Sequence, residues 1–132
     1  MLGTWKKYVM NHKLSNVVRF VGSQSDVDKY LVQSNIFIMS SKDEGLPVAA
    51  QEALRAGLAL ILTDVGGCKE LIDDNGYLVS SPDVEEIVNA IIEVTKDVSR
   101  IKDMRSRSRE MFVEKYTREK MLFQYLQLIN NI

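Results

Sequence analysis

Two glutamates eight residues apart are the side chains best suited to chemistry in this sequence. Glu44 follows the apolar run 36–39, and Glu52 lies about two helical turns into a stretch that Pro47 opens and Gly57 ends. A carboxylate accepts two hydroxyl hydrogen bonds in a fork, which suits a vicinal diol. The pair therefore offers a carboxylate to each side of a polyhydroxylated ligand.

The segment between the two glutamates predicts a site for an anion. A strand over 36–39 followed by a helix over 47–56 places Gly45, Leu46 and Val48 where backbone N–H groups have no intrahelical partner. Such N–H groups, together with the helix dipole, favour a phosphate. Carboxylates on both sides of a phosphate cradle suit a nucleotide-sugar, which carries hydroxyls on both sides of its phosphates.

Simpler roles for the two carboxylates are also open at this point. Glu44 could cap the start of the helix, and Glu52 could pair with Arg55 three residues on. A glycosidase acid/base pair is disfavoured, because eight mostly helical residues separate the two backbones by roughly 10 Å or more. The phosphate cradle would also lie between them.

The elements around the site predict an α/β domain. Continuous apolar runs indicate strands buried on both faces, as in a parallel sheet, and we expect four in the order 17–21, 36–39, 58–62 and 77–79. Helical periodicity predicts helices over about 2–14, 26–34, 47–56, 67–73, 83–95, 98–114 and 118–130. We expect one partial domain over 1–132, with an α/β core over 1–95 and C-terminal helices over 96–132.

Composition excludes several classes of function. The 132 residues carry a net charge of −1, which predicts no nucleic-acid partner, and no apolar run approaches the ~18 residues of a membrane span. A single cysteine, Cys68, fits a reducing compartment; it could be activated at a helix start, but an inert small residue is the simpler interpretation. With His12 as the only histidine, we expect no metal site and no cofactor.

Four stretches together resemble one enzyme family. They are Glu44-x7-Glu52 with Gly-Leu-Pro after the first glutamate, the N-V-x-F-x-G-like strand 16–22, the D-x-G-G-x-x-E loop 64–72, and the N-G-x-L-V strand 75–79. The combination resembles the donor site of retaining GT-B glycosyltransferases of the group-4 type, which carry an E-x7-E signature. The resemblance covers roughly residues 14 to 125.

The resemblance implies a fold and a set of site residues. The fold would be the Rossmann-like C-terminal domain of a GT-B enzyme, here incomplete, with helices on both faces of its sheet. Glu44 would be the catalytic-site carboxylate, and the donor sugar and diphosphate would contact Glu44, Gly45, Leu46, Pro47 and Val48. The nucleotide would contact Glu52, Gly22, Phe20 and Ser41, and further loop contacts would come from Thr63, Asp64, Gly66 and Gly67.

The resemblance also implies an activity and partners. The chain would be the donor half of a hexosyltransferase in polysaccharide biosynthesis, taking a nucleotide-diphosphate sugar and serving a glycan or lipid-linked acceptor. We expect a cytoplasmic protein, and a location at the inner face of the membrane is an alternative to free diffusion. The segment 96–120 has nine basic and five acidic residues, so a solvated helical face or contact with anionic lipid would explain it.

Several departures from the family pattern bear on activity. Ser40 and Ala59 stand where the family usually has proline, and Arg55 replaces a small residue. The family's upstream basic pair and its N-terminal acceptor domain are not in these 132 residues. We therefore expect the chain alone to be inactive and to expose apolar surface that favours self-association. A non-catalytic binding fragment, or another GT-B enzyme such as a sugar-nucleotide epimerase, is the alternative.

Overall fold

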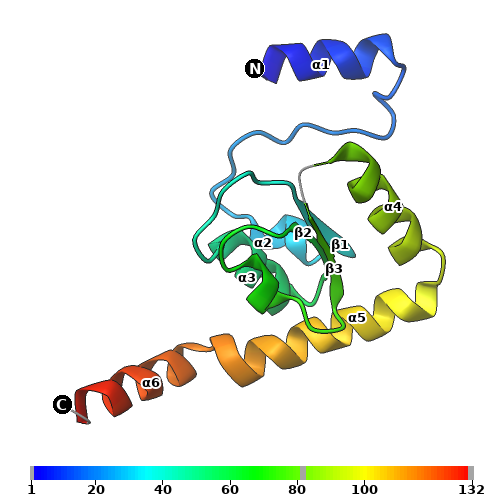
Figure 1. The fold of residues 1–132 in the computed structure, drawn as a ribbon. Coiled ribbons are helices and arrows are strands. Elements are labelled where there is room, and N and C mark those ends of the chain that lie inside the picture. Colours follow the sequence, from blue (N-terminus) through cyan, green and yellow to red (C-terminus); the bar gives the residue numbers. More distant parts are fainter. Residues whose placement is uncertain (1, 81–82, 131–132) are drawn as a thin grey trace.

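The computed structural model describes residues 2–80 and 83–130 of the chain (Figure 1). The three strands in this part are β1 (Ile36–Met39), β2 (Ala59–Thr63) and β3 (Gly76–Val79). The helices are α1 (Leu2–Asn11), α2 (Asp28–Leu31), α3 (Val48–Ala56), η1 (Cys68–Leu71), α4 (Val84–Thr95), α5 (Val98–Met111), η2 (Phe112–Tyr116) and α6 (Arg118–Asn130).

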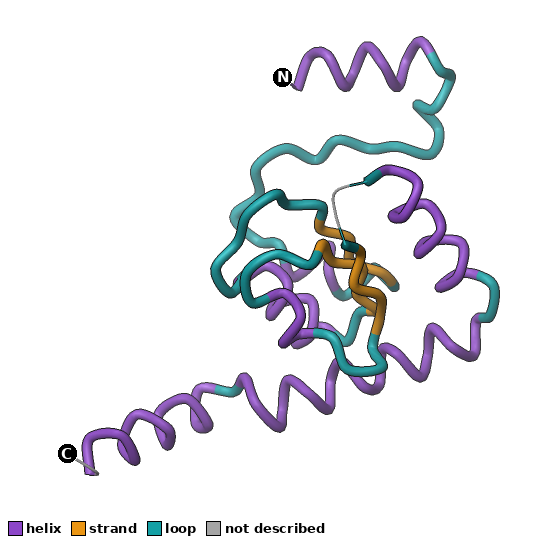
Figure 2. Tube along the Cα trace, viewed as in Figure 1, coloured by secondary structure: helices purple, strands orange, loops and turns teal. Residues whose placement is uncertain are grey.

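The sheet is parallel and has β2 at its centre. The strand order is β1-β2-β3, with Ile36 opposite Ala59 and Leu60 opposite Gly76. Every residue of β2 is fully buried, as the continuous apolar run from Leu58 to Leu62 predicts. Figure 2 shows the strands side by side at the centre of the molecule, with helices around them.

Helices cover both faces of the sheet, and each face has its own apolar cluster. Leu60 and Leu62 point to one face and pack with α2, α3 and η1. Ala59 and Ile61 point to the other face and pack with α4 and the first half of α5. The predicted α/β architecture, with a parallel sheet between two helical layers, is confirmed.

The predicted strand over 17–21 is wrong. These residues form no strand, the described sheet has three strands rather than four, and the direct pairing of 17–21 with β1 does not occur. Val17 is 77% exposed, and the N–H groups of Val17 and Val18 donate to the carbonyl of Leu14 in a turn instead. A β-branched run forms a strand only beside a free strand edge. In the doubly wound order two further strands would separate 17–21 from β1, which leaves the run without a neighbour.

The boundaries of the helices differ from the predictions mainly where the segments are short. The predicted helix over 26–34 contracts to α2, whose N-cap is Val27 rather than Ser25 or Asp26. The predicted helix over 67–73 is a single 3₁₀ turn, η1. By contrast the start of α4 agrees with the prediction: Asp83 is its N-cap, and the Asp83 carboxylate accepts from the N–H groups of Glu85 and Glu86.

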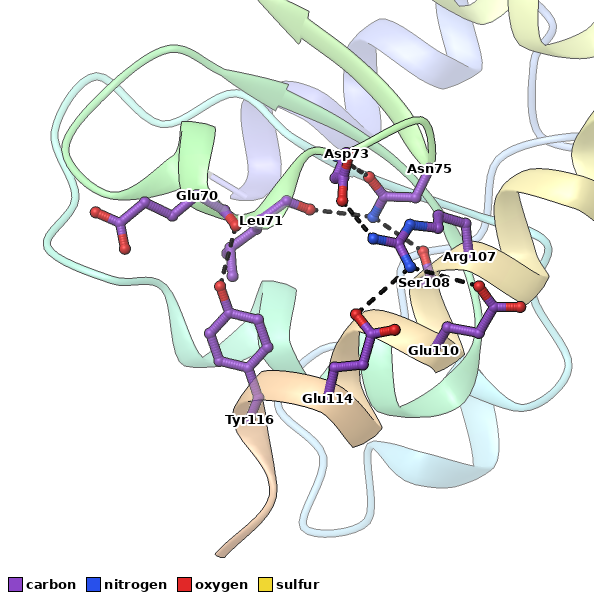
Figure 3. A network of polar contacts seen from close by, with 9 residues as sticks. All are labelled: Glu70, Leu71, Asp73, Asn75, Arg107, Ser108, Glu110, Glu114 and Tyr116. Atoms are coloured by element: carbon purple, nitrogen blue, oxygen red, sulfur yellow. Dashed lines mark hydrogen bonds and ion pairs between the residues drawn. The ribbon is translucent and has the colours of Figure 1, made fainter. Parts of the chain in front are cut away.

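A buried polar network joins α5 to the residues just before strands β2 and β3 (Figure 3). Ser108, fully buried, donates its hydroxyl to the carbonyl of Leu58 at 2.6 Å. Asn75 donates its side-chain amide to Ser108 Oγ at 3.1 Å and to the carbonyl of Leu71 at 3.0 Å. Because each buried polar group has a partner, the network fixes α5 against the core.

A second set of contacts lies at the surface end of this network. Arg107 of α5 forms ion pairs with Asp73, Glu110 and Glu114 (Figure 3). The bond from Arg107 and its charge lower the pKa of Asp73 below its usual range. Further along, the hydroxyl of Tyr116 donates to the carbonyl of Glu70 at 3.0 Å, and burial raises the pKa of that phenol. The C-terminal helices are thus bound to the domain as far as Tyr116.

The two outer helices, α1 and α6, bury none of their residues. The exposed fractions of Trp5, Tyr125 and Ile129 are 56%, 60% and 65%, so the predicted apolar exposure is confirmed. Figure 1 shows both helices projecting away from the sheet. No helix in residues 2–80 and 83–130 combines the length and apolarity that a membrane span requires.

Candidate ligand site at the carboxyl end of the sheet

The loops after β1 and β2 meet at the carboxyl end of the sheet, where ligands bind in open α/β folds. The N–H of Gly67 donates to the carbonyl of Gly45 at 2.7 Å. Gly66 has φ +51°, and a β-carbon on it would lie 1.8 Å from the carbonyl oxygen of Glu44. Gly66 and Gly67 therefore allow the backbone of the loop after β1 to pack against them, and this contact fixes the backbone at Glu44.

Glu44 is held from β1 and β2 together. The hydroxyl of Ser41 donates to Glu44 Oε1 at 2.7 Å, and the fully buried Thr63 donates its hydroxyl to the carbonyl of Ser41 at 2.7 Å. The chain Thr63–Ser41–Glu44 therefore orients a partly buried carboxylate at the strand ends. Ser41 and Thr63, both predicted as site residues, are engaged inside the protein.

Helix α3 begins without a side-chain cap. Its N-cap is Pro47, one residue before the helix rather than inside its first turn, and among the described residues no side chain accepts from the first N–H groups. The alternative that Glu44 caps this helix is therefore wrong. Leu46 and Val48 are 43% and 68% exposed, so this end of α3 faces solvent. The first-turn amides are available to an anion.

Glu52 is not engaged by its neighbour on the helix. Arg55 pairs with Asp28 of α2 at 2.5 Å, so the local Glu52–Arg55 pair does not form. Glu52 makes no hydrogen bond or ion pair with any residue that the structure describes. A partly buried carboxylate without a protein partner is free to accept hydroxyl groups from a ligand.

The predicted nucleotide contacts near residue 20 line a separate pocket. Phe20 lies with Arg19, Val21 and Tyr30 around an open cavity of about 410 Å³. Gly22 stands just beyond with φ +66°. Neither Glu44 nor Glu52 lines this cavity, so the structure does not bring Phe20 and Gly22 together with the two glutamates.

The loop after β2 supplies charge and a thiol. Asp64 is exposed, and its N–H donates to the carbonyl of Val79 at 2.7 Å, which extends the pairing of β2 with β3 by one residue. Burial raises the pKa of the Cys68 thiol, and the carboxylates of Glu44 and Asp64 raise it further. Cys68 is thus a buried neutral thiol, despite its place at the start of η1. In the part of the chain that the structure covers, His, Cys, Asp and Glu form no group of three that could hold a metal ion.

One group of residues beside the site was not predicted. Lys115 and Tyr116 of η2 and Met121 of α6 enclose, with Leu46 and Gln51, a cavity of about 420 Å³. It adjoins the cradle because Leu46 belongs to both. No sequence pattern could have found it, since it depends on how η2 carries the chain back toward the start of α3.

Comparison with known proteins identifies the family. Residues 3–111 match the family model of glycosyl transferases group 1, and the chain belongs to this family. N-acetyl-alpha-D-glucosaminyl L-malate synthase of Bacillus anthracis is 32% identical over 119 residues, which are 89% of this chain and 31% of that protein. The chain thus spans about a third of the length of this relative.

Solved structures identify the fold. HepE of Anabaena, solved in complex with UDP, superposes with a TM-score of 0.91 at 18% identity, over 99% of this chain and 37% of that one. The C-terminal domain of the group 1 protein LpcC of Francisella tularensis superposes with a TM-score of 0.74 at 23% identity, over 86% and 60%. Family and fold together define a C-terminal, Rossmann-like domain of a GT-B glycosyltransferase.

Proposed function

We propose that this chain is the donor-binding domain of a retaining glycosyltransferase that takes a sugar from a nucleotide-diphosphate sugar. The observation that carries the proposal is the arrangement around α3. Glu44 is held in place by Ser41, the start of the helix is uncapped, and Glu52 has no partner in the described chain. Family membership supports it, as does the UDP bound to the HepE structure.

Each element of the site has a role in this proposal. Glu44 accepts hydroxyls of the donor sugar, and the N–H groups of Gly45, Leu46 and Val48 hold the diphosphate. Glu52 accepts the two ribose hydroxyls, and the base extends away from the glutamates toward the separate cavity that Phe20 lines, with Gly22 next to it in the chain. Pro47 shapes the cradle, Asp64, Gly66 and Gly67 form its wall, and the buried Thr63 supports it through Ser41. Ser41 acts on the ligand through Glu44.

The proposed reaction breaks the bond between the anomeric carbon and the diphosphate. An acceptor hydroxyl oxygen bonds to that carbon with net retention of configuration, and the nucleoside diphosphate departs and takes up the hydroxyl proton on its leaving oxygen. Backbone amides at the start of α3 stabilise the negative charge that develops on the leaving diphosphate. The E-x7-E spacing of Glu44 and Glu52 thus places sugar recognition before the start of α3 and nucleotide recognition within it.

In this proposal the acceptor binds to a part of the enzyme outside these 132 residues, as the greater length of the relative implies. The acceptor in this proposal is a glycan or lipid-linked sugar, and the enzyme works in the cytoplasm at the inner face of the membrane. Because the chain spans about a third of its relative, we expect the 132 residues alone to transfer no sugar. We also expect weak donor binding, since Lys115 is the one cation among the residues that line the cavity beside the cradle, and it would face a diphosphate alone.

Calorimetric or ligand-observed NMR titration with UDP, GDP and ADP, free and as sugar conjugates, tests the proposal. Glu52→Gln should weaken binding of nucleotide and nucleotide-sugar alike, by about tenfold, because a charge-assisted bond is lost. Glu44→Gln should weaken only the sugar conjugate. Glu119→Gln, an exposed position on α6, is the matched control and should change neither.

Three outcomes contradict the proposal. Silence with every nucleotide would leave a domain that folds but binds no donor. Equal effects of the Glu44 and Glu52 variants on free nucleotide would remove the division of roles. Sugar transfer by the pure 132-residue chain, abolished by Glu44→Ala, would overturn the expectation that a second domain is required.

A further inference from the structure

The C-terminal end of α3 borders a pocket whose charged side chains are all cationic. An open cavity of about 340 Å³ is lined by Arg55, Lys102, Arg105, Arg109 and Ser106, with no carboxylate in its wall. In Figure 1, α5 passes below α3 at this point. Glu44 precedes the other end of the nine-residue helix, so about 13 Å of helix separates this pocket from the candidate donor site.

Two of the four cations have a structural role here. Arg105 Nε donates to the carbonyl of Gly57 at 2.8 Å, and its Nη1 donates to Asn35 Oδ1 at 2.8 Å. Arg109 Nη1 donates to the carbonyl of Arg55 at 2.8 Å. These bonds satisfy carbonyls at the end of α3 that have no intrahelical partner.

Capping does not use all the donors of the cluster. Arg109 donates one N–H group to the carbonyl of Arg55, and the other N–H groups of its guanidinium remain available as donors. Lys102 has no hydrogen bond or ion pair with any residue in the described ranges. The hydroxyl of Ser106 has only a long contact, 3.4 Å, to Glu110. An ammonium, part of a guanidinium and a hydroxyl therefore face one cavity.

The charges of this cluster repel one another. Arg105 and Arg109 stand four residues apart on one face of α5, a spacing at which like charges destabilise a helix. Lys102 extends the same face one turn earlier. Among the described residues, Asp28 is the one carboxylate paired with a cation of the cluster, through Arg55. Capping of α3 does not explain why Lys102 also lines the pocket, whereas a bound anion would offset the repulsion between Lys102 and the arginines.

We propose that this pocket binds a phosphate monoester group through Lys102, Arg109 and Ser106, at a site separate from the donor cradle. A phosphate oxygen accepts from ammonium, guanidinium and hydroxyl donors alike, and charge-assisted bonds to phosphate are the strong ones. The group can come from a small metabolite or from a lipid headgroup, because both present the same terminal phosphate.

Backbone NMR of the 132-residue chain, titrated with inorganic phosphate at constant ionic strength, tests the site. We expect saturable shifts of amides at Gly57 and around Lys102 to Arg109. Lys102→Gln should weaken the apparent affinity roughly two- to fivefold, as for removal of one exposed ionic contact, and Lys102→Arg should preserve it. Lys120→Gln removes the same charge from α6, away from the pocket, and should leave the affinity unchanged.

Vesicle flotation separates the two sources of phosphate. Binding to phosphatidylcholine vesicles that contain phosphatidic acid, weakened by Lys102→Gln and by added inorganic phosphate, assigns the site to a lipid headgroup. Saturable phosphate shifts without vesicle binding assign it to a soluble phosphoester. Shifts that stay linear with phosphate, or equal losses in the Lys102 and Lys120 variants, overturn the proposal.

Discussion

The main-chain carbonyl of Glu44 occupies the space that a side chain on Gly66 would need. A β-carbon at Gly66 would come within 1.8 Å of that oxygen and 2.8 Å of the carbonyl carbon, at φ +51°. The loop after β2 therefore sets the position of the loop that carries Glu44. The carboxylate at the site is aligned by contact between two loops as well as by the strand that precedes it.

Gly66→Ala should for this reason destabilise the chain by about 2–4 kcal/mol, from left-handed strain and from the clash with backbone. Gly45→Ala is the matched control, because a β-carbon there meets nothing within 4 Å. It should cost little. Urea unfolding followed by circular dichroism measures both, and equal losses in the two variants would show that the Glu44–Gly66 contact is not the cause.

Ser41→Ala should loosen Glu44 without unfolding the domain. The variant removes the 2.7 Å bond to Glu44 Oε1 but leaves the bond from Thr63 to the Ser41 carbonyl in place. We expect nucleotide-sugar affinity to fall about three- to tenfold while affinity for free nucleotide is kept. Ser40→Ala, at an exposed neighbour, is the control for titration. A loss shared equally by nucleotide and nucleotide-sugar would count against an effect through Glu44.

The ion pair between Asp73 and Arg107 predicts a pH dependence with a definite sign. The bond from Arg107 and its charge lower the pKa of Asp73 in the folded state. A lowered pKa stabilises the fold above the unfolded-state pKa of about 3.9, and this stabilisation is lost as pH falls through the folded-state pKa.

Asp73→Asn should accordingly be less stable than the parent chain near neutral pH, by a small margin because the pair is at the surface. The gap in the free energy of unfolding should close in acid. Asp74→Asn changes the neighbouring carboxyl, which has no ion pair in the described chain, and should show no such gap. Thermal unfolding between pH 2 and pH 7 follows the difference, and a gap that persists in acid would rule out the ionic origin.

What the sequence predicts well is what a single segment encodes. The apolar run that forms β2 has no alternation, so burial on both faces follows directly from its composition. The same holds for α3, bounded by Pro47 and the left-handed Gly57, and for the spacing that places Glu44 and Glu52 on either side of its start.

What the sequence could not predict depends on partners distant in the chain. Residues 17–21 have strand propensity, but a strand also needs an edge to pair with, and no pattern within the run reports whether one is near. The bond from Arg105 to the Gly57 carbonyl joins residues 48 apart, and the charge pattern of α5 gives no sign of it. The sequence predicts Gly66 as a contact to the ligand, whereas the atom that requires a glycine there belongs to Glu44.

The apolar side of α6 leads to a last prediction. Leu122, Leu126 and Ile129 stand one turn apart along this helix, and their exposed fractions are 48%, 58% and 65%. An exposed stripe of this kind is costly in water, so its burial against another surface would be favourable. In the 132-residue chain by itself, a second copy is the surface within reach, and we expect association that increases with concentration.

Leu122→Glu combined with Leu126→Glu should abolish that association, because charges on the stripe oppose its burial. Gln124→Glu combined with Gln127→Glu adds the same charge on the polar side of α6 and should associate like the parent chain. Sedimentation or light scattering across a concentration series measures the mass of all three. A parent chain that stays monomeric throughout, or a control pair that dissociates as fully as the leucine pair, would show that this stripe does not drive contact between copies.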